Sequence, residues 1–180
     1  ARTRLAAIST GAARQCAVHQ APASELERVT PPESVDFCLT SPPYWNILTR
    51  SRTADAKDIR NYGNQQGDLG VVDDYEQYLD GLEEVFQGVF RALRPGAYCC
   101  VVVMDLRKKD RFYPLHSDLA ARMQAIGFEW DDLIIWNRQS EYNNLRPLGY
   151  PSVFRVNKVH EYVLIFQKRQ RARAAASRRR

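Results

Sequence analysis

The amino-acid sequence predicts an α/β fold, with a mainly parallel sheet of about four main strands and an antiparallel last strand. Three observations lead to this prediction. Short apolar runs alternate with two amphipathic helical patterns, as in chains that pack helices against a buried sheet. The run at 97–105 is apolar throughout, which is typical of a strand covered on both faces. The last two apolar runs have no helical pattern between them, so we expect the final strand to be antiparallel to its neighbours.

The first 74 residues contain one predicted main strand and one long loop. Residues 14–21 predict a short edge strand, and residues 24–29 predict one or two helical turns. The apolar run from Val35 to Leu39 follows a Pro-Pro turn and predicts a buried strand. Residues 46–74 are polar and aperiodic, and a loop of this length inside a compact domain is usually functional.

Two helices and the remaining strands follow. From Tyr75 onward, apolar residues recur every three or four positions, which predicts a helix capped by Asp73 or Asp74. The Arg-Pro-Gly sequence at 94–96 ends this helix, and Gly127 ends a second one. The remaining strands are expected in three segments: 97–105, 129–138 and 160–168.

The composition is that of an ordinary globular protein and argues against several classes. Hydrophobic residues make up 44% and charged residues 26% of the chain. No apolar run approaches the roughly 20 residues of a membrane-spanning helix, and no secretory signal pattern is present. The four cysteines lack the spacing of a zinc site. We therefore expect no metal, no membrane association and a cytoplasmic location.

The net charge of +5 is concentrated at the C-terminus. The segment from Lys168 to Arg180 holds seven of the 26 basic residues and no acidic residue. The remaining 19 basic residues face 21 acidic ones, so residues 1–167 carry a net charge of −2. We expect one folded region over 1–168 and a basic, disordered tail over 169–180. Such a tail either contacts nucleic-acid phosphates or is simply solvated.

The sequence Thr-Ser-Pro-Pro-Tyr-Trp at 40–45 directly follows the first predicted strand. Ligands of α/β sheets bind beyond the carboxyl ends of the strands. Two prolines hold the backbone extended and contribute no N–H, so the Ser41 hydroxyl and a free proline carbonyl can both accept hydrogen bonds from an exocyclic amino group. The Tyr44 ring offers a stacking surface to a flat heterocycle. The alternative is a rigid turn with a partly buried tyrosine.

Residues 34–46, Ser-Val-Asp-Phe-Cys-Leu-Thr-Ser-Pro-Pro-Tyr-Trp-Asn, resemble the catalytic motif of the DNA amino-methyltransferases. This family methylates cytosine N4 or adenine N6 with S-adenosylmethionine. Further stretches resemble the same family in the same order: 15–36, 75–98, 99–107, 111–138 and 149–168. The resemblance covers about 14–168 and implies a partial Rossmann-like methyltransferase fold, with 1–168 as the catalytic, target-base region.

The resemblance also implies roles for the motif residues. Ser41 and the Pro42 carbonyl would accept hydrogen bonds from the target amino group, which makes its nitrogen more nucleophilic. Pro43 belongs to the same catalytic motif. Tyr44 would stack on a base flipped out of the duplex, and Trp45 would wall the pocket. Ser rather than Asp or Asn at position 41 favours cytosine N4 over adenine N6.

Five further residues are weaker candidates. We expect Arg50 and Arg107 to contact DNA phosphates and Trp136 to lie near the pocket. Thr40 and Asp105, at the ends of two predicted strands, are candidate contacts to the cofactor. For each of them an ordinary structural role is the alternative.

The sequence departs from the family in its cofactor half. Relatives with this motif order carry a Phe-x-Gly-x-Gly loop after the matching segment, and this chain has no Gly-x-Gly. We therefore expect the target-base half of a site-specific DNA methyltransferase of a restriction–modification system. The strand before 40–45 would then be an edge that pairs with a further half or a second chain. The alternatives are a non-catalytic remnant that binds nucleic acid and a methyltransferase acting on RNA or protein amides.

Overall fold

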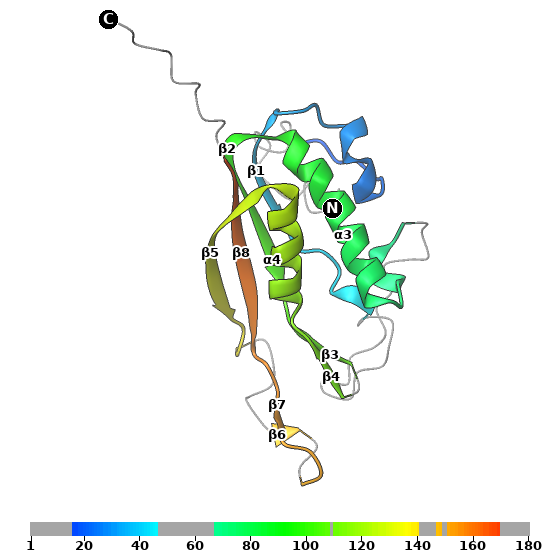
Figure 1. Ribbon diagram of the computed structural model, residues 1–180, viewed down its shortest axis with the longest axis vertical. Helices are drawn as coiled ribbons and strands as arrows, with labels where there is room; N and C mark the ends of the chain where they lie inside the picture. The colour runs from blue at the N-terminus through cyan, green and yellow to red at the C-terminus, as the bar shows by residue number, and fades with distance from the viewer. Residues whose placement is uncertain (1–15, 47–66, 109, 141–146, 149–150, 170–180) are drawn as a thin grey trace, which may run out of the picture.

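The computed structural model describes residues 16–46, 67–108, 110–140, 147–148 and 151–169 (Figure 1). The elements in chain order are η1 (Ala23–Arg28), β1 (Val35–Thr40), η3 (Leu69–Val71), α3 (Tyr75–Ala92), β2 (Leu93–Val103), β3 (Leu106–Lys108), β4 (Arg111–Tyr113), α4 (Leu115–Ile126), β5 (Phe128–Asn137), β6 (Pro147–Leu148), β7 (Arg155–Val156) and β8 (His160–Lys168). Each predicted helix and main strand is present. The edge strand expected at 14–21 is wrong for its described part, because residues 16–21 form no regular structure.

The main sheet has four strands in the order β1-β2-β8-β5. β1 and β2 are parallel, and β8 is antiparallel to both β2 and β5. Three of the four strands therefore run in one direction, and the last strand runs against them as expected. The sequence did not predict that β8 inserts between β2 and β5, which leaves β1 and β2 as the only parallel pair of this sheet. β1 forms one edge, and the chain leaves this edge strand directly into residues 41–46.

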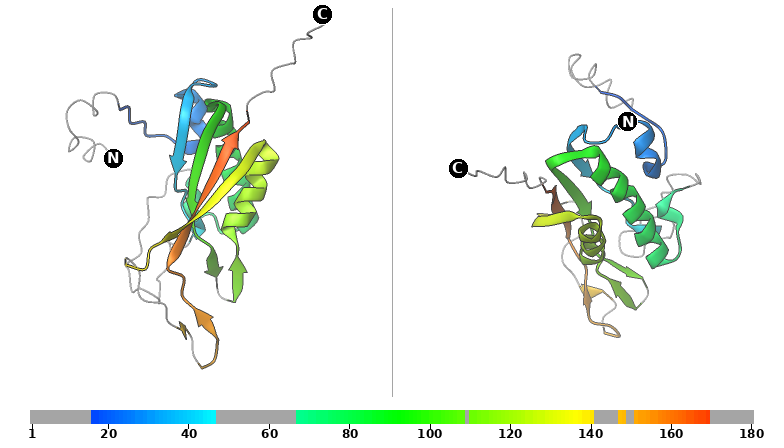
Figure 2. Two further views of the ribbon diagram at one scale, coloured as in Figure 1. Left: turned by 90° about the vertical axis from the view of Figure 1, so that its left-hand side faces the viewer. Right: turned by 45° about the horizontal axis from the view of Figure 1, so that its top comes forward.

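Both described α-helices pack on one face of the main sheet (Figure 2). The core beneath them is formed by buried side chains of α3, α4 and the inner strands, including Phe86, Leu119, Val101, Leu164 and Phe166. On β1, Cys38 packs against this core, whereas Phe37 and Leu39 are 55% and 65% exposed on the opposite face. The strand at 97–105 was expected to be covered on both faces, but the described helices cover only one face of the sheet that contains it.

The helix ends follow from local chemistry. The Asp74 carboxylate accepts a hydrogen bond from the backbone N–H of Gln77 over 2.9 Å and so caps α3. Gly127 ends α4 at a φ of +119°, a left-handed conformation that favours glycine. The buried Lys168 ammonium donates to the carbonyl of Phe90, in the last turn of α3, and to that of Leu93, the C-cap of the helix. Within the described residues, no helix is long and apolar enough to cross a membrane.

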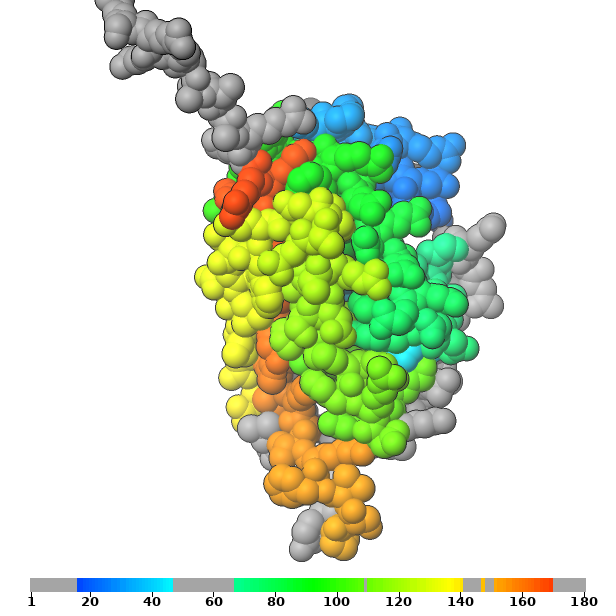
Figure 3. Space-filling model, in the orientation of Figure 1, coloured from blue at the N-terminus to red at the C-terminus, as the bar shows by residue number. Residues whose placement is uncertain are grey.

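Two short hairpins project from the end of the main sheet at which β1 and β2 finish. β3 pairs with β4, and β6 pairs with β7. The space-filling view shows the segment that contains β7 extending beyond the body of the molecule (Figure 3). Strands of two or three residues are too short for apolar periodicity to reveal, so the sequence does not predict them.

Candidate functional site

The backbone of the motif is held by its own turn and by helix α3. The Pro43 carbonyl accepts hydrogen bonds from the backbone N–H of Trp45 over 2.8 Å and from the Tyr78 hydroxyl over 2.6 Å. Burial raises the pKa of Tyr78, so its hydroxyl remains a donor. No described residue donates to the Pro42 carbonyl. Of the two proline carbonyls, only that of Pro42 is thus without a donor in the part of the chain that the structure describes.

Tyr44 connects the motif to the ends of two other strands. Its hydroxyl lies 3.2 Å from the Ser41 Oγ and donates to the Glu161 Oε2 over 3.1 Å. Glu161 is 3% exposed, and its other oxygen lies 2.9 Å from the Arg138 Nη1. The Arg138 guanidinium in turn lies 4.5 Å from the centroid of the Trp136 ring. We call these five residues the Tyr44 network. It joins the carboxyl end of β1 to the end of β5 and the start of β8.

The Trp45 side chain, unlike that of Tyr44, is buried in the hydrophobic core. The residue adopts a φ of +50°, which is unusual for a bulky residue and marks a sharp change in chain direction after Tyr44. Its ring is 4% exposed and packs edge-on against Tyr75 and Tyr113, with centroid distances of 5.2 and 4.9 Å. The Lys108 ammonium lies 3.8 Å from the ring centroid. Trp45 was expected to wall the pocket, and the structure places it beneath the motif as packing support.

Asp105 belongs to a separate set of contacts between β2 and β3. Its side chain is buried, with one carboxylate oxygen 2.6 Å from the His116 Nδ1 and 3.2 Å from the His116 backbone nitrogen. The Lys158 ammonium donates to the Asp105 backbone carbonyl over 3.3 Å, and burial lowers the pKa of Lys158. This arrangement directs the Asp105 carboxylate to the start of α4.

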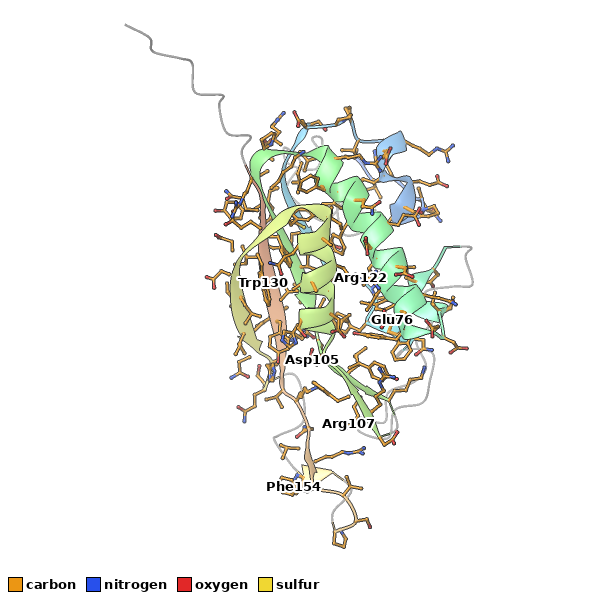
Figure 4. The ribbon with its side chains drawn as sticks, in the orientation of Figure 1. Glu76, Asp105, Arg107, Arg122, Trp130 and Phe154 are labelled. Carbon is orange, nitrogen blue, oxygen red and sulfur yellow. The ribbon has the colours of Figure 1, made fainter. Side chains whose placement is uncertain are left out.

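The remaining predicted residues are scattered around this end of the sheet. Thr40 is the last residue of β1, half-buried and opposite Val101 on β2. Trp136 is partly exposed and belongs to the Tyr44 network. Arg107 is exposed on β3 (Figure 4). Arg50 lies outside the described residues.

No functional role was expected for Glu161, Arg138 or Tyr78. Tyr78 was counted as a core residue of the amphipathic helix. A signal for Glu161 does exist in the sequence, because an acidic residue at the start of an otherwise apolar strand is rarely buried without a partner. The identity of that partner could not be read from the sequence, since Tyr44 and Glu161 are 117 positions apart.

A shallow cleft of about 380 Å³ lies on the side of Trp45 that faces the start of α3 and the β3–β4 hairpin. Its lining combines four acidic with two basic side chains: Asp73, Asp74, Glu76, Asp110, Lys108 and Arg111. The three carboxylates at the start of α3 make the cleft itself a poor match for DNA phosphates, whereas Lys108 and Arg111 line its other side on the β3–β4 hairpin. We therefore place the candidate site at Ser41 to Tyr44 rather than in the cleft.

A family model described as DNA methylase, of the N6 and N4 class, matches residues 35–178. Two type II methyltransferases of Methanocaldococcus jannaschii are similar in sequence. M.MjaI is 27% identical over 76% of this chain, and M.MjaVI is 26% identical over 61%. The matches cover 50% and 48% of these relatives, so the chain spans about half their length.

Two solved structures also resemble this chain, over about half of their own length. TTHA0409 of Thermus thermophilus, named as a candidate DNA modification methylase, was solved in complex with S-adenosyl-L-methionine. It is 29% identical, with a TM-score of 0.60 over 88% of this chain and 58% of that one. The cytosine-N4-specific PvuII DNA methyltransferase is 20% identical, has a TM-score of 0.57 over 83% of this chain and 48% of that one, and shares the fold. Since the family match spans most of its length, this chain belongs to the N6/N4 family of DNA methylases.

Proposed function

We propose that this chain is the target-base half of a DNA amino-methyltransferase. It binds a base flipped out of the duplex and presents the exocyclic amino group to S-adenosylmethionine, with cytosine N4 favoured over adenine N6. The observation that carries the proposal is the placement of Ser41, Tyr44 and the Pro42 carbonyl, to which no described residue donates, together at the carboxyl end of β1. Family membership supports this chemistry at this position.

The hydrogen-bond directions in the motif suit an amino group. Because the Tyr44 hydroxyl donates to Glu161, its oxygen can accept the Ser41 proton. The lone pairs of the Ser41 oxygen and of the Pro42 carbonyl then remain for the two N–H groups of the base. Accepting both of these bonds favours a pyramidal nitrogen whose lone pair is less delocalised into the ring. Positioning and electrostatics of this kind need no covalent intermediate on the protein.

The cofactor side of the site is incomplete in the described residues. S-adenosylmethionine supplies a methyl group on a positively charged sulfur. Asp105, one candidate contact, is buried and its carboxylate is bound by His116. The other, Thr40, lies on the edge strand of the sheet, and the sequence contains no Gly-x-Gly.

We infer that further polypeptide completes the donor site, either within the same protein or as a second chain. The β1 edge can pair with another strand, and the exposed Phe37 and Leu39 give that polypeptide an apolar surface to cover. The length of the relatives agrees with such a second half. Their description as type II methyltransferases supports a role in restriction–modification.

The test is methyl transfer from tritiated S-adenosylmethionine to unmethylated DNA. The chain is assayed alone and together with the region of M.MjaI that it does not cover, and the modified nucleoside is identified by mass spectrometry. N4-methylcytosine is the expected product, and N6-methyladenine would keep the site but reverse the base preference. Label in RNA or in a glutamine-containing peptide instead of DNA would select an amide or RNA methyltransferase. DNA binding with neither transfer nor cofactor binding would indicate a non-catalytic remnant.

A further inference from the structure

We propose that the β3–β4 and β6–β7 hairpins form a DNA clamp beside the target-base site. Basic side chains of the clamp hold backbone phosphates, and Phe154 inserts into the base stack where the target base has left it. The inference rests on the proposed function, because it takes duplex DNA as the partner. It goes further by assigning the surface that grips the duplex and the side chain that enters it.

The β3–β4 hairpin contacts both the end of the motif and the segment after β7. Lys108, the last residue of β3 beside the hairpin turn, places its ammonium 3.3 Å from the Asn46 Oδ1 and also contacts the Trp45 ring. Lys158, which follows β7, places its ammonium 4.3 Å from the centroid of the Phe112 ring on β4. Figure 4 shows Arg107 and Phe154 at the same end of the molecule, beyond Asp105. DNA bound across the hairpins would therefore lie against the site of the flipped base.

The two hairpin segments concentrate positive charge on a body that is otherwise acidic. The described residues of 106–113 and 147–160 together include five basic residues and one acidic residue, a net charge of +4. Residues 1–167 as a whole carry a net charge of −2. Arg107 and Arg111 are both exposed, and their guanidinium groups lie 5.5 and 4.9 Å from the ring centroids of Phe112 and Tyr113. Arginines held in this way on a rigid hairpin suit phosphate contacts.

Phe154 is the most exposed large hydrophobic residue among those described. Its side chain is 87% exposed, and the nearby Val153 and Val156 are also exposed. Apolar side chains on projecting elements act in DNA-binding proteins as wedges between base steps. Flipping a base leaves a gap in the stack that an aromatic ring can fill. A protein partner would also accept an apolar tip, but the surrounding positive charge favours a polyanion.

The phosphate contacts are tested by salt dependence. Anisotropy of a labelled duplex is measured over a series of salt concentrations for the wild-type chain and for the double variant R107A/R111A. We expect the slope of log K against log salt to fall in magnitude by about 2, since each lost phosphate contact removes about 0.9. The matched control R28A/R94A removes the same charge at the opposite end of the molecule and should retain the wild-type slope (Figure 1). Equal slopes for both double variants, or no DNA binding by the wild type at low salt, would overturn the clamp.

The wedge is tested with two duplexes that differ by one abasic site. Wild type should bind the duplex with the gap more tightly, by about 5- to 150-fold, the range that corresponds to stacking one base. F154A should lose this preference, and V153A should keep it. An identical preference in wild type and F154A would refute insertion. A preference for A-form RNA duplex that responds in the same way to F154A would assign the clamp to RNA instead of DNA.

The clamp and the proposed function fail in different ways. If only the clamp proposal is wrong, methyl transfer is still detected and R107A/R111A has the same salt slope as the wild type. If only the proposed function is wrong, no methyl transfer is detected, but R107A/R111A still lowers the salt slope and the wild type still prefers the duplex with the gap.

Discussion

The Tyr44 hydroxyl donates a hydrogen bond to the Glu161 carboxylate over 3.1 Å, although the two residues are 117 positions apart in the sequence. Glu161 is buried and bound on its other side by Arg138. A buried carboxylate is stable only when its oxygens are paired, so this contact fixes the position of the tyrosine ring as well as the acid. The proposed base-stacking surface is thus attached to the start of β8.

Two substitutions of Tyr44 separate its ring from its hydroxyl. Tyr44→Ala should cost about 1–3 kcal/mol in binding of a flipped base, because the stacking surface is lost. Tyr44→Phe retains the ring and should lose less than half of that. Binding of a duplex that carries a mismatched target base, compared with its paired form, measures this difference. Equal losses for the two variants would mean that the hydroxyl, rather than stacking, accounts for the effect.

Glu161→Gln should lower the free energy of unfolding by about 2–3 kcal/mol. It removes the charge that pairs with Arg138, which is mostly buried, and it weakens the bond that Tyr44 donates. Urea unfolding measures the loss. Glu129→Gln is the matched control, because Glu129 pairs with Arg169 at the surface, where an ion pair contributes little, and it should change stability far less than Glu161→Gln does. A similar effect of both substitutions would contradict the structural importance assigned to Glu161.

Ser41→Ala should reduce methyl transfer more than it reduces DNA affinity. The Ser41 hydroxyl is proposed to bond the amino nitrogen most strongly as that nitrogen becomes pyramidal, so its loss should appear in kcat. The measurement is kcat and KM of the enzyme completed by its cofactor half. A rise in KM at unchanged kcat would instead assign Ser41 to ground-state binding.

Gly127→Ala should destabilise the fold by about 1–2 kcal/mol. The left-handed backbone at this position disfavours any Cβ, and an added Cβ would lie 3.2 Å from the Phe90 ring. Gly88→Ala provides the contrast within helix α3, because a Cβ there meets only an ordinary contact at 3.9 Å. It should be neutral or stabilising by up to about 1 kcal/mol. Thermal unfolding of both variants tests whether the end of α4 is set by backbone conformation.

The Glu129–Arg169 ion pair should make stability depend on pH in the acid range. Bonding to Arg169 lowers the pKa of Glu129 below its ordinary value of 4.5. The stabilisation is therefore complete above pH 4.5 and is lost as the pH falls through the folded-state pKa. The stability difference between wild type and Glu129→Gln, followed from pH 6 to pH 3, should shrink toward the acid end. A constant difference would show that the pair is not formed in solution.

Local patterns predicted the main elements of the fold because periodicity and caps report on local structure. Asp74 and Gly127 act where the sequence placed them, and β1 is the expected edge. The insertion of β8 between β2 and β5 depends on pairings between distant segments that no local pattern reveals. The same limit applied to the site. The motif was recognisable from consecutive residues, whereas the contact to Glu161 and the burial of Trp45 depend on tertiary packing.

Photo-crosslinking tests the central claim that Tyr44 meets the target base. A duplex with 5-iodocytosine opposite a mismatch, which lowers the cost of flipping, is irradiated with the chain, and the crosslinked residue is mapped by mass spectrometry. A parallel duplex carries 8-bromoadenine. The account predicts a crosslink at Tyr44 that Tyr44→Ala abolishes. Crosslinks confined to other residues, with Tyr44 unmodified and the yield unchanged in Tyr44→Ala, would contradict it.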